Sequence, residues 1–293
     1  MKVKHSGASA FGPNPWQQTS WDWRAAGNFI CGGAGTGLLL ASALFGAAAP
    51  ASLWKPDWLV FAGLALVGLG LLCVWLEIGR PLRALHVFLN PQTSWMTREA
   101  FVGLVLFPAG LAAMLGVSGW SWITAALAMV FLYCQSRMLP AARGIPAWRS
   151  DQMSPLFILT ALCEGLGIFL LFSIFHARTS NAAPWLFLLA LVLRLLVWRR
   201  YRRSVDESLA ARARNALDLA GQRLLIVGTV VPLVLLAAGW LLGASLQPML
   251  VALAGACAAY AGANVKYTLV TRASFNQGFA LARIPIRGVR DIP

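Results

Sequence analysis

The stretch Glu77–Glu99, EIGRPLRALHVFLNPQTSWMTRE, decides how the rest of the chain is divided. It joins two long apolar segments and carries too many charged residues to lie in lipid. Pro81 and Pro91 exclude one straight helix across it, because proline lacks the amide hydrogen that a helix interior requires. The stretch is therefore predicted to be a structured connector at one membrane surface.

The second half of this connector has the chemistry of a turn followed by a helix start. Asn90-Pro91 favours a turn, and either Ser94 or Thr97 is predicted to be the N-cap of the next helix. A charged connector with a defined turn is typical of a ligand or docking surface. The alternative is a plain basic loop that obeys the charge rule for membrane proteins.

The composition is that of a polytopic membrane protein. The chain has 293 residues, of which 59% are hydrophobic and 12% charged, and its mean hydropathy is +0.69. The net charge of +14 is explained by positive charge on one side of a bilayer, so no nucleic-acid partner is expected. The five cysteines lie in apolar segments without the close spacing of metal motifs, so we expect no iron–sulfur cluster or other metal site in this chain.

We predict an all-α integral membrane protein with eight transmembrane helices, since each apolar segment is close to the ~20 residues that cross a bilayer. The expected spans are 25–49, 58–76, 97–115, 120–139, 155–175, 184–198, 224–242 and 248–270, with a charged amphipathic linker from 199 to 223. We divide the chain into an interfacial or partner-contacting arm (1–24), a first four-helix bundle (25–139), a second (140–270) and a basic tail (271–293).

The basic residues indicate the orientation. All 24 Lys and Arg residues except Lys55 and Arg178 are assigned to one face, which holds both termini and the connectors after the second, fourth and sixth spans. That assignment includes Arg194 and Lys266. Because basic residues are retained in the cytoplasm, both termini and the 77–99 connector are predicted to be cytoplasmic.

Two residue types are candidates for chemistry. Glu164 lies near the middle of a predicted span, where a charge costs ~2.5–3.5 kcal/mol, so it should face the bundle interior as a proton relay or as a packed, hydrogen-bonded carboxyl. The three histidines, His5, His86 and His176, do not form an axial pair within spans, so no haem is expected. His86 is either a proton donor and acceptor or a solvated interfacial side chain.

The run 78–103, IGRPLRALHVFLNPQTSWMTREAFVG, resembles the quinone-reactive membrane anchors of molybdopterin oxidoreductases, of the dimethyl sulfoxide reductase and polysulfide reductase types. The matching positions are Gly79, Pro81, Arg83, Ala84, Ser94, Met96, Thr97 and Glu99. Residues 14–30, NPWQQTSWDWRAAGNFI, are similar to the membrane subunit of phenylacetyl-coenzyme A:acceptor oxidoreductase. One departure is Glu77, which stands where several anchors have a histidine.

The resemblance implies a complex in the bacterial cytoplasmic membrane. A molybdopterin subunit catalyses the substrate reaction, a four-cluster iron–sulfur subunit carries electrons, and this chain exchanges them with ubiquinone or menaquinone. The expected quinone-binding and proton-handling residues are Glu77, Arg80, His86, Glu99 and Glu164, and the expected docking residues are Arg83, Arg98, Trp16 and Trp21. The alternatives are a secondary transporter that uses Glu164 as its coupling acid, or a purely structural anchor.

Overall fold

The computed structural model describes residues 14–46, 56–78, 81–172, 174, 182–243 and 245–278, with the side chains of residues 81–84 excepted. Apart from one isolated antiparallel bridge between Gln17 and Phe275, the regular elements of this part of the chain are helices. Eight helical segments within the described residues are long and apolar enough to cross a membrane. The predicted all-α membrane fold is confirmed.

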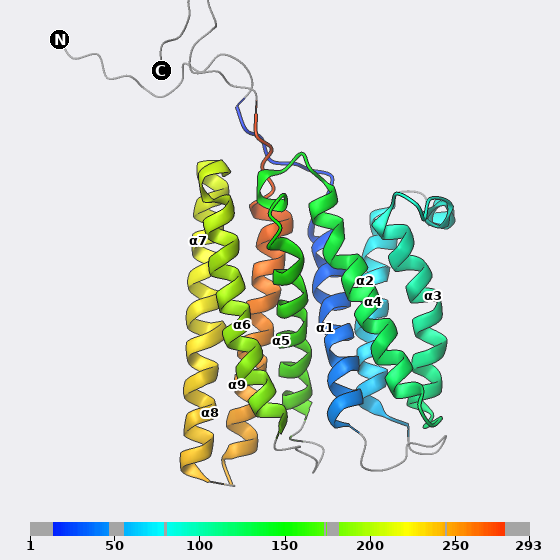
Figure 1. Ribbon diagram of the computed structural model, residues 1–293, viewed down its shortest axis with the longest axis vertical. Coiled ribbons are helices and arrows are strands. Elements are labelled where there is room, and N and C mark those ends of the chain that lie inside the picture. The colour runs from blue at the N-terminus through cyan, green and yellow to red at the C-terminus, as the bar shows by residue number, and fades with distance from the viewer. Residues whose placement is uncertain are drawn as a thin grey trace, which may run out of the picture.

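The helices cover most of the described chain (Figure 1). They are α1 (Trp23–Phe45), α2 (Trp58–Glu77), η1 (Pro81–Leu89), α3 (Trp95–Met114), α4 (Trp120–Ala141), η2 (Pro146–Trp148), α5 (Met153–Phe172), α6 (Ala182–Val205), η3 (Asp206–Ser208), α7 (Ala211–Leu225), η4 (Ile226–Val230), α8 (Val231–Leu242), α9 (Gln247–Tyr267) and η5 (Thr268–Arg272).

The connector after α2 folds as its sequence indicates. It forms the 3₁₀ segment η1, a turn, and then α3, for which Ser94 is the N-cap: its side chain accepts a hydrogen bond from the Thr97 amide at 3.2 Å. The Thr97 hydroxyl in turn donates to the carbonyl of Val87, which ties η1 to the start of α3. Of the two predicted N-caps, Ser94 is the correct one.

The charged segment 199–223, predicted to be a linker, is mostly helical. α6 continues to Val205, and α7 begins at Ala211 and runs through the π-helical segment η4 into α8. The predicted amphipathic character is confirmed, whereas the start of the seventh helix is corrected from 224 to Ala211. The charged residues of α7 lie outside the face that packs against the protein. That face of α7 carries buried apolar residues at helical spacing, namely Ala213, Leu217, Ala220 and Leu224.

Two basic residues assigned to the charged face are buried instead. Arg194 of α6 is fully buried, and its guanidinium donates to the carbonyls of Ala258 at 3.0 Å and Gly228 at 2.5 Å. Gly228 lies in the π-helical segment, whose wider turn changes the hydrogen-bonding pattern of the helix. Lys266 of α9 is also buried. The assignment of both residues to the charged face is therefore corrected.

α1 and α5 pack closely against each other near the middle of the molecule (Figure 1). α1 also contacts α2 and α4, while α5 contacts α6 and α9. The backbones of α1 and α5 approach closely where Gly37 lies against Ala161 and Gly165, because a Cβ atom at Gly37 would clash with the α5 backbone. The division into two four-helix bundles stays a prediction.

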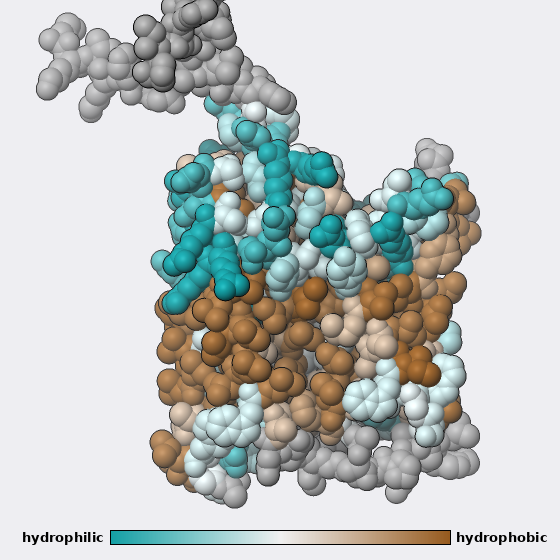
Figure 2. Space-filling model, viewed as in Figure 1, coloured by the Kyte–Doolittle hydropathy of each residue, from teal (hydrophilic) through white to brown (hydrophobic). Residues whose placement is uncertain are grey.

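The surface has an apolar belt with hydrophilic residues gathered at one end of the helices (Figure 2). The two described ends of the protein meet at that end: the Gln18 amide donates to the Ser274 carbonyl, and the Asn276 amide donates to the Trp16 carbonyl, each at 3.0 Å. The described ends therefore lie on the same side, as an even number of spans requires. The assignment of this side to the cytoplasm stays a prediction.

Candidate functional site

A cavity of about 160 Å³ lies at the hydrophilic end of the first four helices. It is bounded by the start of α1, the end of α2, the start of α3 and the end of α4. Its lining is mainly apolar and includes three side chains that can form hydrogen bonds, Trp21, Asn28 and Glu77. The lining residues are Trp21, Ala25, Asn28, Phe29, Val74, Glu77, Ile78, Met96 and Met138. We call this space the α1–α4 cavity.

A buried polar cluster adjoins the α1–α4 cavity at Asn28. The side-chain amide of Gln135, on α4, donates to Glu99 Oε1 at 3.2 Å and to the main-chain carbonyl of Asn28 at 3.0 Å. Glu99 of α3 is only 3% exposed and forms no ion pair with any described residue. Asn28 Oδ1 and Gln135 Oε1 are buried without a hydrogen-bond partner in the described part of the chain. The cluster therefore has unused hydrogen-bonding capacity.

Arg24 joins two of the helices at the rim of this cavity. Its guanidinium forms an ion pair with Asp22 at 2.9 Å and donates to the carbonyl of Leu76, next to Glu77, at 2.8 Å. The hydrogen bond from Arg24 holds the pKa of Asp22, the N-cap of α1, below its usual value. Sequence reasoning counted Arg24 only as a surface charge. Its position one helical turn before Asn28 was the available signal.

The comparisons with known proteins bear on this arrangement. Residues 34–242 match the family of the DMSO reductase anchor subunit (DmsC). The protein belongs to this family of membrane anchors. Over 117 residues it is also 27% identical to the C subunit of the anaerobic dimethyl sulfoxide reductase of Haemophilus influenzae, a match that covers 36% of this protein and 42% of that subunit. The match thus spans less than half the length of this curated relative. The resemblance of residues 78–103 to this type of anchor is confirmed.

Two of the predicted site residues lie at the α1–α4 cavity or in the polar cluster that adjoins it. Glu77 lines the α1–α4 cavity, and Glu99 lies in the polar cluster behind Asn28. His86 is exposed on η1 and is not among the residues that line this cavity. Arg80 lies outside the described residues. Asn28 and Gln135 are the additions, because neither was among the predicted site residues.

The predicted docking residues have different surroundings. Trp16 is half-exposed, whereas Trp21 lines the α1–α4 cavity and stacks on Trp148 with ring centroids 5.1 Å apart. Arg98 donates to the carbonyls of Pro91 and Gln92, at 2.9 and 2.7 Å. Arg98 therefore holds its own turn in place. The side chain of Arg83 lies outside the described residues, and the docking role of all four residues stays a prediction.

Glu164 belongs to a second buried cluster on another side of α1. Its carboxylate forms an ion pair with Lys266 Nζ at 2.5 Å, and both side chains are 1% exposed. Glu164 faces the bundle interior, as predicted from its place in the span. Sequence reasoning missed Lys266 as its partner, although that residue lies inside the predicted span 248–270, where a lysine requires a counter-charge.

α1 separates the two clusters at a pair of glycines. A Cβ atom at Gly32 would clash with Gln135 Nε2, and one at Gly33 would clash with Lys266 Nζ. The small residues of α1 therefore serve helix packing, and they also make room for two polar side chains. This separation lets one helix hold two independent buried polar groups.

A third feature of the apolar belt is a groove of about 130 Å³ between α1, α5 and α6. Every residue that lines it is apolar: Gly37, Leu40, Ala41, Leu44, Leu159, Leu162, Leu166, Leu186, Leu189, Ala190 and Leu193. This groove can accept a hydrocarbon tail, but its side chains offer no hydrogen bond to a polar ring.

Proposed function

We propose that this anchor exchanges electrons between an iron–sulfur subunit and the quinone pool, and that the α1–α4 cavity is its quinone site. The iron–sulfur subunit, expected to carry four clusters, would dock on the hydrophilic end and connect the anchor to a molybdopterin catalytic subunit. Membership of the DMSO reductase anchor family supports these partners. The cavity supports the quinone, because it lies at the end where the partner would dock.

One observation carries the proposal: a cavity with apolar walls adjoins a buried carboxyl that has no cation partner among the described residues. Apolar walls with a few placed polar groups are typical of small-molecule sites. At about 160 Å³ this cavity is smaller than the ~300 Å³ at the low end of such sites. It would hold a quinone ring and leave the isoprenoid tail in lipid.

The polar side chains fit the two forms of the ligand. A quinol hydroxyl donates a hydrogen bond and a quinone carbonyl accepts one, and an asparagine amide can do both after rotation of its side chain. Asn28 lines the cavity and its Oδ1 atom is unpartnered among the described residues. Asn28 and Glu77 are therefore our proposed contacts to the ring oxygens. The apolar groove lacks such groups.

Quinone reduction takes up two electrons and two protons, so the site needs a proton route. Glu77 is partly exposed at the rim, where water can supply protons, and Glu99 is buried behind Asn28. We propose that these two carboxyl groups pass protons to the ring oxygens as electrons arrive from the iron–sulfur subunit. Quinol oxidation runs the same steps in reverse. His86, which is exposed on η1, would act from the water-facing side. A role for Arg80, which lies outside the described residues, stays a prediction.

The remaining parts of the proposal concern orientation and substrate. We place the hydrophilic end (Figure 2), with both termini, in the cytoplasm of a bacterium, because the basic connectors that follow α2, α4 and α6 lie at that end. Oxidation of phenylacetyl-coenzyme A by the catalytic subunit is proposed from residues 14–30, and such a thioester is confined to the cytoplasm. The transporter alternative is disfavoured, because Glu164 is paired with Lys266 and lines neither the α1–α4 cavity nor the apolar groove.

The experiment fills the cavity in the purified complex. Val74→Phe places a ring in the α1–α4 cavity, and Leu162→Phe places one in the apolar groove as the matched control. We expect Val74→Phe to slow the reduction of the iron–sulfur clusters by quinol on the order of 100-fold, since displacement of a reactant by about 1 Å has this effect. Reduction by a water-soluble viologen should not change. A quinol rate lost in Leu162→Phe and kept in Val74→Phe would contradict the site.

A further inference from the structure

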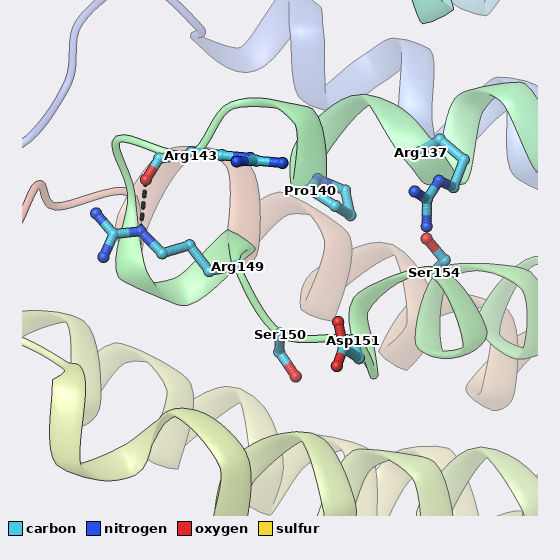
Figure 3. A pocket seen from close by; sticks show the side chains of 7 residues that line it. All are labelled: Arg137, Pro140, Arg143, Arg149, Ser150, Asp151 and Ser154. Atoms are coloured by element: carbon cyan, nitrogen blue, oxygen red, sulfur yellow. Dashed lines mark hydrogen bonds between the residues drawn. The ribbon is translucent and has the colours of Figure 1, made fainter.

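A second, larger cavity of about 560 Å³ lies between the end of α4 and the start of α5 (Figure 3). It is lined by Arg137, Pro140, Arg143, Arg149, Ser150, Asp151 and Ser154. The lining thus contains three guanidinium groups, two hydroxyls and one carboxylate. We propose that this arginine cavity binds the phosphate of an anionic phospholipid headgroup. It shares no lining residue with the α1–α4 cavity.

The three guanidinium groups lack carboxylate partners. Among the described residues no ion pair is formed by Arg137, Arg143 or Arg149, and the nearby Asp151 does not neutralise them. Among the described residues Arg149 bonds uncharged oxygens, donating to the Arg143 carbonyl at 2.5 Å and to the Gln277 side chain at 3.1 Å. Arg137 Nε is buried without a hydrogen-bond partner in the described part of the chain. A phosphate would supply the missing charge and acceptors.

A neighbouring basic cavity shows the contrast. It is lined by the end of α6 and by α7, and it measures about 480 Å³. There Arg202 forms ion pairs with Asp206 at 2.8 Å and with Asp218 at 2.6 Å. The protein thus places two carboxylates within ion-pair distance of Arg202, and among the described residues it places none within that distance of Arg137, Arg143 or Arg149. An external anion is the remaining source of negative charge for these three arginines.

The surface below Arg137 points to a lipid as the source of that anion. Ala126, Val130 and Tyr133 are exposed at spacings of three and four residues, and Arg137 continues the same face of α4. Hydrophilic residues lie directly next to the apolar belt on this side of the molecule (Figure 2). An acyl tail along this stripe would place its phosphate at the arginine cavity. Basic pockets between transmembrane helices are known lipid headgroup sites.

The test compares two triple variants of the full-length protein in detergent. One carries Arg137→Gln, Arg143→Gln and Arg149→Gln. The control carries Arg200→Gln, Arg212→Gln and Arg272→Gln, which removes the same charge from exposed positions that line neither basic cavity. Native mass spectrometry measures the fraction of each protein that retains added phosphatidylglycerol or phosphatidylcholine. Circular dichroism checks that both variants keep their helix content.

We expect wild type and control to retain phosphatidylglycerol. The cavity variant should lose on the order of 100-fold in retention, because three arginines at roughly 1 kcal/mol each give about 3 kcal/mol and 1.4 kcal/mol is tenfold. Phosphatidylcholine should be retained weakly by all three. Equal retention of phosphatidylglycerol by the two variants would overturn the proposal. So would its full displacement by millimolar inorganic phosphate, which would indicate a free-anion site. Release of the lipid when the partner subunits bind would indicate an acidic protein surface as the occupant and would overturn it as well.

Discussion

The two buried clusters on either side of α1 each hold a carboxyl group inside the membrane, and they stabilise it in different ways. Glu164 is neutralised by Lys266 at 2.5 Å, whereas within the described part of the chain Glu99 has uncharged partners such as Gln135 and no ion pair. A paired carboxylate in a membrane stabilises a helix contact and cannot easily change its charge. A carboxyl without a cation can gain or lose a proton next to a cavity. The difference teaches that burial alone does not identify a functional acid; the partner and the adjoining space do.

The largest effect is expected from breaking the ion pair. Lys266→Met leaves the Glu164 carboxylate buried and unpaired, and removal of one partner of such a pair costs about 3–5 kcal/mol. The double variant Glu164→Gln/Lys266→Met should recover much of this loss. Unfolding in mixed micelles, followed by circular dichroism, measures both. Arg200→Met, at an exposed position of α6, is the control and should change little. Equal stability of Lys266→Met and the control would show that the pair contributes nothing.

The next largest effect is expected on the rate at which quinol reduces the iron–sulfur clusters. Glu99→Gln keeps the size of the side chain and removes its exchangeable proton, so quinol-driven reduction of the iron–sulfur clusters should fall about 100-fold. Reduction by viologen and resistance to unfolding should stay close to those of the wild type. The complex is assayed with both reductants in the same preparation. A parallel loss with both reductants would assign Glu99 to assembly.

The sequence predicted the positions of the spans and the burial of Glu164. It did not predict which residues contact the buried acids. A helical repeat and a hydrophobic length are local properties, so the eight spans, the Ser94 N-cap and the inward position of Glu164 could be read along the chain. Which helices become neighbours is decided by packing between distant segments. The contacts of Gln135 with Asn28 and of Lys266 with Glu164 join residues more than a hundred positions apart.

The position of a basic residue in the sequence does not show whether its side chain is buried. Arg194 and Lys266 lie near the ends of predicted spans and were counted as surface charges, yet both are buried and partnered. A long basic residue near a helix end can reach water or turn inward toward a carbonyl or a carboxylate. The backbone geometry of the π-helical segment, which provides the Gly228 carbonyl, has no signature in residue order.

The two clusters can also be compared through Gly32 and Gly33 of α1, which contact one cluster each. Gly33→Ala should displace Lys266 and lower stability by roughly 1–3 kcal/mol, as overpacking does. Gly32→Ala should displace Gln135 and slow the quinol reaction while viologen reduction continues. Both variants are compared by unfolding and by the rate of cluster reduction. If the two substitutions gave the same pattern, α1 would not separate the clusters.

The smallest effect is expected at the rim. Glu77 is partly exposed, and water can replace part of its proton supply, so Glu77→Gln should slow quinol-driven cluster reduction by no more than about tenfold. The effect should be weaker than that of Glu99→Gln under the same conditions. A larger loss in Glu77→Gln would reverse the roles that we propose for the rim and the buried carboxyl.

The most direct test of the central claim is covalent labelling with a photoreactive quinone. The complex is illuminated with the probe, with and without an excess of unlabelled quinol, and labelled residues are identified by mass spectrometry. The account predicts protected labels at the walls of the α1–α4 cavity, in residues 21–29 and 74–78 and at Met96 and Met138. Protected labels confined to the apolar groove, in residues 40–44 and 186–193, would contradict it.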